Sequence, residues 1–111
     1  MVDSPKAIVV DLAKLRDYCL SVDHPRGRGK ARVFRSRLGL EARDSVWLRD
    51  VSIDAVATRR SELRETGADQ YRRRFVLDFE VATAAGTAMV RPAWMIRTRE
   101  DILRLVTCYV L

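Results

Sequence analysis

Apolar residues in the first part of the chain recur every three or four positions, which is the spacing of amphipathic helices. A first helix is predicted to begin at Asp11, a suitable cap, and to end at His24-Pro25, because the residue before a proline is forced out of helical geometry. A second helix is predicted over residues 28–38, and Gly39 is suited to end it. A third helix is predicted over residues 45–65.

The apolar spacing changes to the two-residue alternation of β-strands near residue 70. Strands are predicted from the segments YRRRFVLDFEV (71–81), AMVRPAWMIRT (88–98) and ILRLVTCYVL (102–111). Pro92 lacks an amide donor and therefore requires a bulge or an edge position. The last segment is apolar on both faces, which is typical of a central strand.

These elements predict one α+β domain over residues 1–111. A short strand-like run, Ile8 to Val10, precedes the first helix. We expect N-terminal helices, over about residues 11–66, to pack on one face of a small C-terminal antiparallel β-meander over about residues 70–111.

The composition, 48% hydrophobic and 32% charged, is normal for a soluble globular domain. No apolar run approaches the roughly 20 residues that a membrane helix needs, so no membrane partner is expected. The two cysteines, Cys19 and Cys108, are too few and too far apart for a disulfide framework or a CxxC metal site. We expect reduced thiols, a cytoplasmic protein, and Cys108 in the core.

The charge is concentrated in one segment, HPRGRGKARVFRSRL, at residues 24–38. The chain has 21 basic and 15 acidic residues, a net charge of +6, and the whole excess corresponds to six bases of this segment: Arg26, Arg28, Lys30, Arg32, Arg35 and Arg37. A focused excess indicates an anionic partner. Gly27 and Gly29 would let the backbone approach a phosphate closely, and Lys30 falls in the first turn of a predicted helix, where an anion is favoured.

The sequence lacks the residues that several kinds of catalytic site need. A single histidine and two distant cysteines make a zinc site unexpected, and GRGK lacks the spacing of a phosphate-binding P-loop. No cofactor is therefore expected. The residues present are compatible with RNA cleavage without a metal. RNA supplies its own 2′-OH nucleophile, so the protein needs only to transfer protons and to stabilise negative charge.

The candidate catalytic residues are His24, Lys30, Thr107 and Tyr109. Histidine suits acid or base work near neutral pH, and the cations around it favour the neutral imidazole. The alternative is that it only caps a helix end. Thr107 and Tyr109 lie two apart on the last predicted strand and share a face, although their hydroxyls could simply bond to neighbouring groups.

Candidate phosphate-binding residues lie in the basic segment and in the predicted sheet. They are Arg26, Arg28, Arg32, Arg35, Arg73 and Arg91. Arg73 and Arg91 interrupt the apolar alternation of their strands, and they would share a face with Thr107 and Tyr109 if the three strands paired in sequence order.

The order of these segments resembles a small bacterial domain family with a helix pair, a glycine-turned Lys-Ala-x-x-Phe helix and a closing RLVTCYVL strand. That pattern is similar to the superfold shared by barnase, EndoU, colicin and RelE-type ribonucleases, which are common among bacterial toxins. The resemblance implies a metal-independent ribonuclease site with His24, Lys30 and Thr107 as its matching positions and Tyr109 nearby. The sequence departs from the pattern at Arg91-Pro92 and at Cys108-Tyr109-Val110.

Two hypotheses follow. One is a toxin-like, metal-independent endoribonuclease, part of a toxin–antitoxin or toxin–immunity pair, with an acidic antitoxin or immunity protein as its partner. The other is a non-catalytic module that binds nucleic acid or an acidic protein through residues 26–37.

Overall fold

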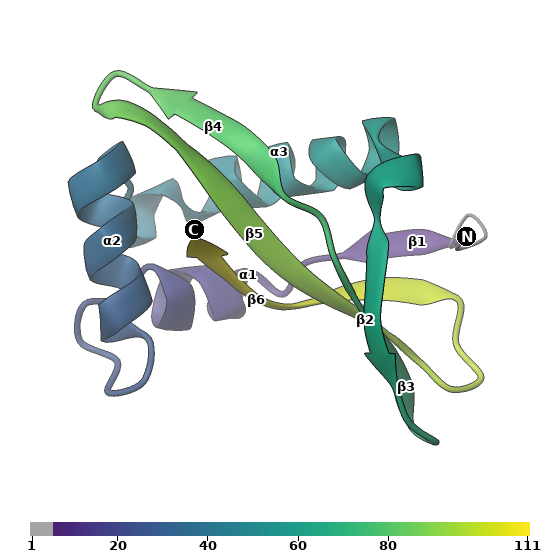
Figure 1. The fold of residues 1–111 in the computed structure, drawn as a ribbon. Helices are drawn as coiled ribbons and strands as arrows, with labels where there is room; N and C mark the ends of the chain where they lie inside the picture. The colour runs from purple at the N-terminus through teal and green to yellow at the C-terminus, as the bar shows by residue number, and fades with distance from the viewer. Residues whose placement is uncertain (1–5) are drawn as a thin grey trace.

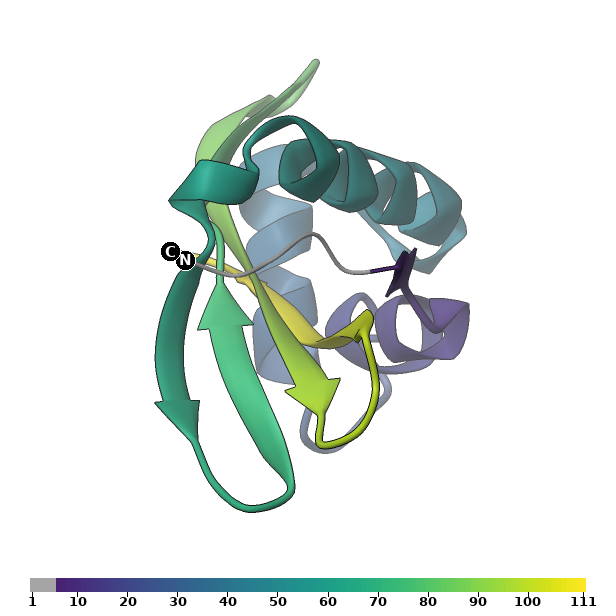
Figure 2. The ribbon, with the colours of Figure 1, turned by 90° about the vertical axis from the view of Figure 1, so that its right-hand side faces the viewer.

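The computed structural model describes residues 6–111 and has two layers, a twisted sheet and helices packed on one of its faces (Figures 1 and 2). The helical elements are α1 (Leu12–Lys14), the π-helix η1 (Leu15–Cys19), α2 (Arg28–Leu38), the 3-10 turn η2 (Ala42–Asp44), α3 (Ser45–Thr58) and the 3-10 turn η3 (Arg60–Glu62). The strands are β1 (Ala7–Val9), β2 (Arg64–Ala68), β3 (Arg72–Val76), β4 (Phe79–Thr83), β5 (Gly86–Arg97) and β6 (Ile102–Val110). The α+β class is confirmed.

The sheet is mixed rather than a purely antiparallel meander. Its order is β1-β6-β5-β3-β2, with β4 pairing β5 beside β3, and the N-terminal β1 runs parallel to β6. β6 is thus an internal strand where β1 pairs with its edge, as its apolar sequence predicted. The helices cover one face, and the other face, seen in Figure 1, stays open.

The first helix ends earlier than predicted. Leu20 donates its amide hydrogen to the carbonyl of Leu15, the five-residue bond of a π-turn, and the helix stops after Cys19. His24-Pro25 therefore does not end this helix. Instead the carbonyl of His24 accepts from the amide of Arg28, so the pair introduces α2.

The third helix is also shorter than predicted, because α3 ends at Thr58 and its polar second half is not α-helical. Arg59 makes the last helical hydrogen bond, to Ala55, and residues from Arg64 onward pair with β3 as the new strand β2. Residues 59–62 are exposed and have no apolar face to pack, so α3 does not continue through them, and the 3-10 turn η3 leads into β2. The second helix ends as predicted, at Gly39, whose φ is 65°.

A proline divides the strand predicted over residues 71–81 into β3 and β4. Both pair the same edge of β5 in one register, with Val76 opposite Ala93 and Phe79 opposite Val90. This register continued would place residue 77 opposite Pro92, which has no amide hydrogen for the ladder. The predicted bulge lies next to it, between Ala93 and Trp94.

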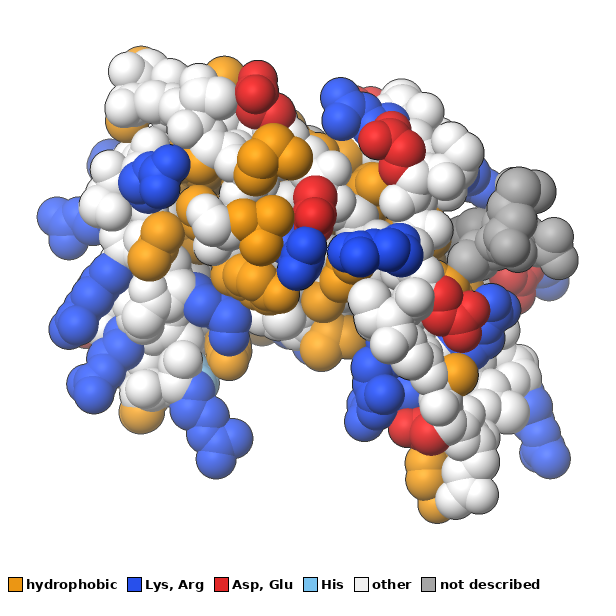
Figure 3. Space-filling view, in the orientation of Figure 1, with side chains coloured by type: hydrophobic (Ala, Val, Ile, Leu, Met, Phe, Trp, Pro, Cys, Tyr) orange, Lys and Arg blue, Asp and Glu red, His pale blue; other side chains and the backbone are white. Residues whose placement is uncertain are grey.

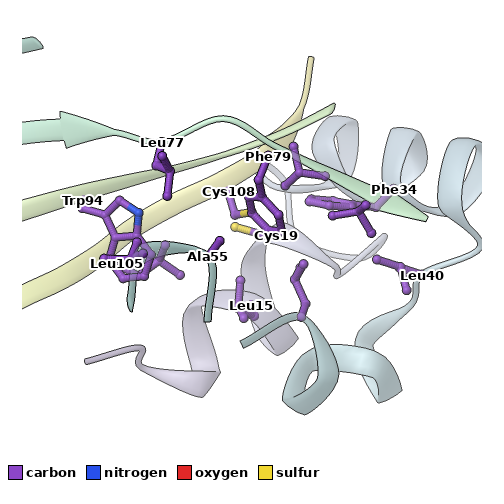
Figure 4. Packing of buried hydrophobic residues seen from close by; sticks show 14 of the residues in the cluster. Leu15, Cys19, Phe34, Leu40, Ala55, Leu77, Phe79, Trp94, Leu105 and Cys108 are labelled. Atoms are coloured by element: carbon purple, nitrogen blue, oxygen red, sulfur yellow. The ribbon is translucent and has the colours of Figure 1, made fainter. Parts of the chain in front are cut away.

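The core fills the space between the helices and the sheet (Figure 4). It includes Leu15, Phe34, Leu48, Phe75, Leu77, Phe79, Trp94, Leu105 and both cysteines. Cys108 is fully buried, as predicted, and burial raises the pKa of its thiol well above the ordinary value. Within residues 6–111, no helix has the length and apolar character needed to cross a membrane.

Candidate functional site

Lys30, in the first turn of α2, lies between two tyrosines from different parts of the fold. Its Nζ donates a hydrogen bond to the hydroxyl of Tyr18 in η1 at 3.2 Å. The same Nζ lies 5.0 Å from the centre of the Tyr18 ring and 6.0 Å from that of Tyr109 in β6. Cation–π attraction to both rings holds the ammonium at the junction of η1, α2 and β6.

His24 adjoins Tyr18 and caps the turn that leads into α2. The two ring centres are 4.8 Å apart. Nδ1 of His24 accepts hydrogen bonds from the backbone amides of Arg26 and Gly27, each at 3.0 Å. Because Nδ1 must carry a lone pair for both bonds, the ring hydrogen is on Nε2, which is left as a donor. His24 thus caps the turn that precedes α2, whose own N-cap is Gly27, and does not cap the end of the first helix as the structural alternative supposed.

Gly27 allows η1 and α2 to approach this closely. It is buried, and a Cβ built on it would overlap the carbonyl oxygen of Tyr18. Gly29, in contrast, has nothing within 4 Å of such a Cβ. The sequence predicted that both glycines let the backbone approach a phosphate. Gly27 instead approaches the protein's own backbone, and only Gly29 faces open space.

Arg91 and Tyr109 extend this group of residues onto the open face of the sheet. They lie directly opposite each other in β5 and β6. Arg91 also binds both carboxylate oxygens of Asp78, at 2.6 and 2.8 Å, and the two side chains are 27% and 28% exposed. Asp78 and then Tyr109 raise the pKa of Arg91 above its ordinary value, while the hydrogen bonds from Arg91 lower the pKa of Asp78.

We call Tyr18, His24, Lys30, Arg91 and Tyr109 the Lys30 cluster. It joins groups from η1, the start of α2, β5 and β6, and so brings together three of the four predicted catalytic residues and one predicted arginine. The cluster combines an ammonium, a guanidinium, two phenols and an imidazole N–H, which together can hold a phosphate and stabilise added negative charge.

Thr107 lies beside the Lys30 cluster rather than within it. It shares a face with Tyr109 and lies opposite Ala93, and its hydroxyl is 3.6 Å from the sulfur of Cys19. Cys19 follows Tyr18 directly in the chain, so Thr107 packs against the segment that supplies one ring of the cluster.

Arg73 is not part of the cluster. It lies opposite Ile96, five residues along β5 from Arg91, which corresponds to about 16 Å. It binds Glu65 at 2.7 Å and covers the ring of Phe75, on the helix side of the sheet. The three predicted strands do pair in sequence order, but the register places Arg73 opposite Ile96, five positions from Arg91 and so on the other face of the sheet.

The arginines of the basic segment form an exposed surface along α2 (Figure 3). Arg26, Arg28 and Arg32 have no ion pair within the described part of the chain, and Arg35 has a single contact of 3.6 Å, to Glu41. The surface formed by these arginines adjoins Lys30 and extends along α2, away from the rest of the Lys30 cluster. An extended anion bound at Lys30 could therefore follow α2.

Sequence reasoning missed two residues of this region. The apolar spacing predicts an ordinary helix around Tyr18, and only the wide π-turn and the contact at Gly27 direct this side chain toward Lys30. The alternation around Asp78 predicts an ordinary strand residue, and its pairing with Arg91 depends on the register around Pro92. No spacing in the sequence shows either relationship.

Comparison with family models matches residues 2–111 to a family described as "Domain of unknown function (DUF6883)". The chain belongs to this family. No match is found among curated proteins or among solved structures.

Proposed function

We propose that this protein is a toxin-like endoribonuclease that cleaves RNA without a metal, with the Lys30 cluster as its active site. The observation that carries the proposal is the position of Lys30, held by Tyr18 and Tyr109 next to the imidazole of His24. A half-buried cation among hydroxyl and N–H donors is suited to the negative charge that develops on a phosphate under attack.

The reaction follows from the groups present. The 2′-oxygen of the RNA bonds to phosphorus, the bond from phosphorus to the 5′-oxygen breaks, and the products are a 2′,3′-cyclic phosphate and a 5′-hydroxyl. Lys30 and Arg91 stabilise the pentacoordinate phosphorane, and Nε2–H of His24 donates to one of its oxygens. Water removes the 2′-OH proton, and the hydroxyl of Tyr109, which lies near Lys30 and opposite Arg91, donates a proton to the leaving 5′-oxygen and regains one from solvent.

The exposed arginines of α2 would hold the flanking phosphates of the RNA. A basic nuclease of this kind needs an acidic antitoxin or immunity protein to cover its site in the producing cell, and its RNA target places it in the cytoplasm.

A second function is favoured by one observation, the capping role of Nδ1 in His24. While this nitrogen holds the two amides, His24 offers no base, so the 2′-OH proton has to go to water, a weak base, and cleavage is disfavoured. In that case residues 26–37 form a non-catalytic surface along α2 that binds RNA.

RNA cleavage in EDTA separates the two functions. The wild type is expected to release fragments with 2′,3′-cyclic phosphate ends, and Lys30→Gln is expected to slow release about a hundredfold or more. Lys14→Gln, a lysine substitution in α1, is the control and should leave the rate unchanged. Binding of RNA with no fragments from the wild type would overturn the nuclease and leave the binding module.

Toxicity gives a second test of the proposed role. Induced expression in a bacterial host should arrest growth for the wild type and not for Lys30→Gln at equal soluble levels. Normal growth with folded wild-type protein would contradict a toxin.

A further inference from the structure

A second group of arginines lies at the far end of β5 from Arg91. A hollow of about 590 Å³ is formed there by the start of β3, the end of β5 and the turn that follows β5. Its lining residues are Gln70, Tyr71, Arg72, Met95, Arg97, Thr98 and Arg99. We call it the distal hollow.

Two arginines of the distal hollow lie directly opposite each other. Arg72 of β3 pairs with Arg97 of β5 in the antiparallel ladder, where like charges repel. The side chain of Arg72 contacts the sulfur of Met95 at 4.0 Å, and its charge interacts with that of Asp69. Arg97 lies 3.9 Å from Glu100.

The carboxylates near these arginines are already occupied. Glu100 binds Arg104 through both oxygens, at 3.0 and 3.2 Å. Asp69 binds Arg74 and accepts from the backbone amides of Tyr71 and Arg72. Arg99 has no ion pair among residues 6–111. Three guanidinium groups thus line the hollow, and the two carboxylates nearest to them are shared with Arg74 and Arg104.

The backbone of the distal hollow carries a further cost. Arg99 has a φ of 71°, in the left-handed region that glycine or asparagine adopts more easily. The hollow is nevertheless well braced, since Thr98 donates its hydroxyl to the carbonyl of Gln70 at 2.7 Å and its amide to the carbonyl of Tyr71 at 2.8 Å. The repulsion between Arg72 and Arg97 and the backbone strain at Arg99 both occur in a segment held firmly by hydrogen bonds. Such unfavourable features at an ordered position indicate that the arginines bind a ligand.

Tyr71 adds an aromatic surface at the edge of the distal hollow. It is 69% exposed, the most exposed of the large hydrophobic side chains described. An exposed ring next to guanidinium groups is suited to stacking on a base whose phosphate the arginines hold.

The open face of the sheet connects the distal hollow to the Lys30 cluster. A second hollow, of about 190 Å³, shares Arg72 and Met95 with it and reaches Ala93, which lies opposite Thr107. Arg97 lies six positions along β5 from Arg91, a span of about 20 Å. Figure 3, which views this face, shows basic side chains at both ends, and hydrophobic, acidic and further basic side chains between them.

We infer that the distal hollow is a second phosphate-binding site, which holds the backbone of single-stranded RNA that extends from the Lys30 cluster, with a base stacked on Tyr71. This inference rests on the proposed function in that RNA is the ligand. A dinucleotide is too short to reach both sites, whereas a dodecanucleotide occupies both.

The test measures binding of 2′-O-methyl RNA, which cannot be cleaved by 2′-OH attack, so that its outcome is independent of catalysis. The double variant Arg97→Gln/Arg99→Gln is expected to bind the dodecanucleotide about tenfold more weakly, with a salt slope lower by about 0.7 for each phosphate that it no longer binds. Dinucleotide affinity should not change. The control, Arg59→Gln/Arg60→Gln, removes two exposed arginines that follow α3 and should bind as the wild type does.

Arg99→Gly gives a second readout, because glycine relieves the left-handed backbone while removing the guanidinium. It is expected to raise the melting temperature and to weaken dodecanucleotide binding. Unchanged dodecanucleotide affinity in the double variant, or an equal loss in the control, would overturn the distal site. If the wild type binds RNA in a length-dependent way but does not cleave ordinary RNA, the distal site is supported and only the nuclease is contradicted. If the wild type does not bind RNA, both the distal site and the nuclease are overturned.

Discussion

Arg91 holds both carboxylate oxygens of Asp78 on the open face of the sheet, next to the position where Pro92 interrupts the hydrogen-bond ladder. The gap lies between β3 and β4, where residues 77 and 78 belong to neither strand of the ladder with β5. The ion pair spans the gap and at the same time orients Arg91 opposite Tyr109. The proline is thus accommodated by a side-chain contact that also builds the candidate site.

The stabilising effect of this ion pair is expected to depend on pH. Hydrogen bonds from Arg91 lower the pKa of Asp78 in the folded state below its unfolded value of about 4, so the contribution is complete above that value. It is lost as the pH falls through the folded pKa. Asp78→Asn should lower the free energy of unfolding at neutral pH, and the difference from the wild type should disappear in acid. Urea unfolding between neutral pH and about pH 2 measures this difference, with the exposed Asp50→Asn as control.

Gly27 and Gly29 are predicted to respond in opposite ways to alanine. A Cβ at residue 27 overlaps the backbone of Tyr18, and forcing extra atoms into such a contact costs about 1–3 kcal/mol. A Cβ at residue 29 meets nothing, and alanine there should stabilise α2 by about 0.5–1 kcal/mol. Thermal unfolding followed by circular dichroism measures both, and equal effects would contradict the close contact at Gly27.

The cap at His24 predicts different effects of alanine and asparagine. His24→Ala removes the acceptor for the amides of Arg26 and Gly27 and should cost about 1 kcal/mol of stability. His24→Asn keeps a short side-chain acceptor and should retain most of that stability. Chemical denaturation gives the stabilities. Equal destabilisation by both variants would show that the ring contact with Tyr18, and not the cap, is what His24 provides.

Arg28 and Arg32 are expected to bind RNA phosphates along α2. Replacing both by glutamine should weaken RNA binding and lower the slope of log affinity against log salt by about 0.7 for each phosphate that is no longer bound. The fold should tolerate the change, because like charges four residues apart destabilise a helix. Fluorescence anisotropy over a salt series measures the slope, and an unchanged slope would contradict a role for α2 in RNA binding.

Local periodicity was sufficient for most of the elements. Residues 28–38 form the predicted helix with its left-handed Gly39 stop, and Phe75, Leu77, Phe79 and Val81 point into the core as their alternation indicated. Elements governed by distant contacts were predicted less well. Residues 59–62 have no apolar face, and the segment after them became β2 because β3 offered it hydrogen bonds, which no local pattern records.

The candidate site shows the same division. Lys30, Tyr109 and His24 were recognised from their chemistry, and the charge excess around them was visible as a count. Arg73 was grouped with Arg91 although it lies on the helix side of the sheet, because alternation within one strand does not give the register between two strands.

The amino-acid order by itself determined the α+β class, the basic α2 and the chemical groups present, since these depend on spacing and residue type within single segments. Only the tertiary structure decided which of those groups meet. The π-turn at Tyr18, the close approach at Gly27 and the skipped pairing of β3 with β5 join segments up to 91 positions apart, from Tyr18 to Tyr109. Such contacts arise from packing and from backbone hydrogen bonds between distant strands, which a local pattern does not specify.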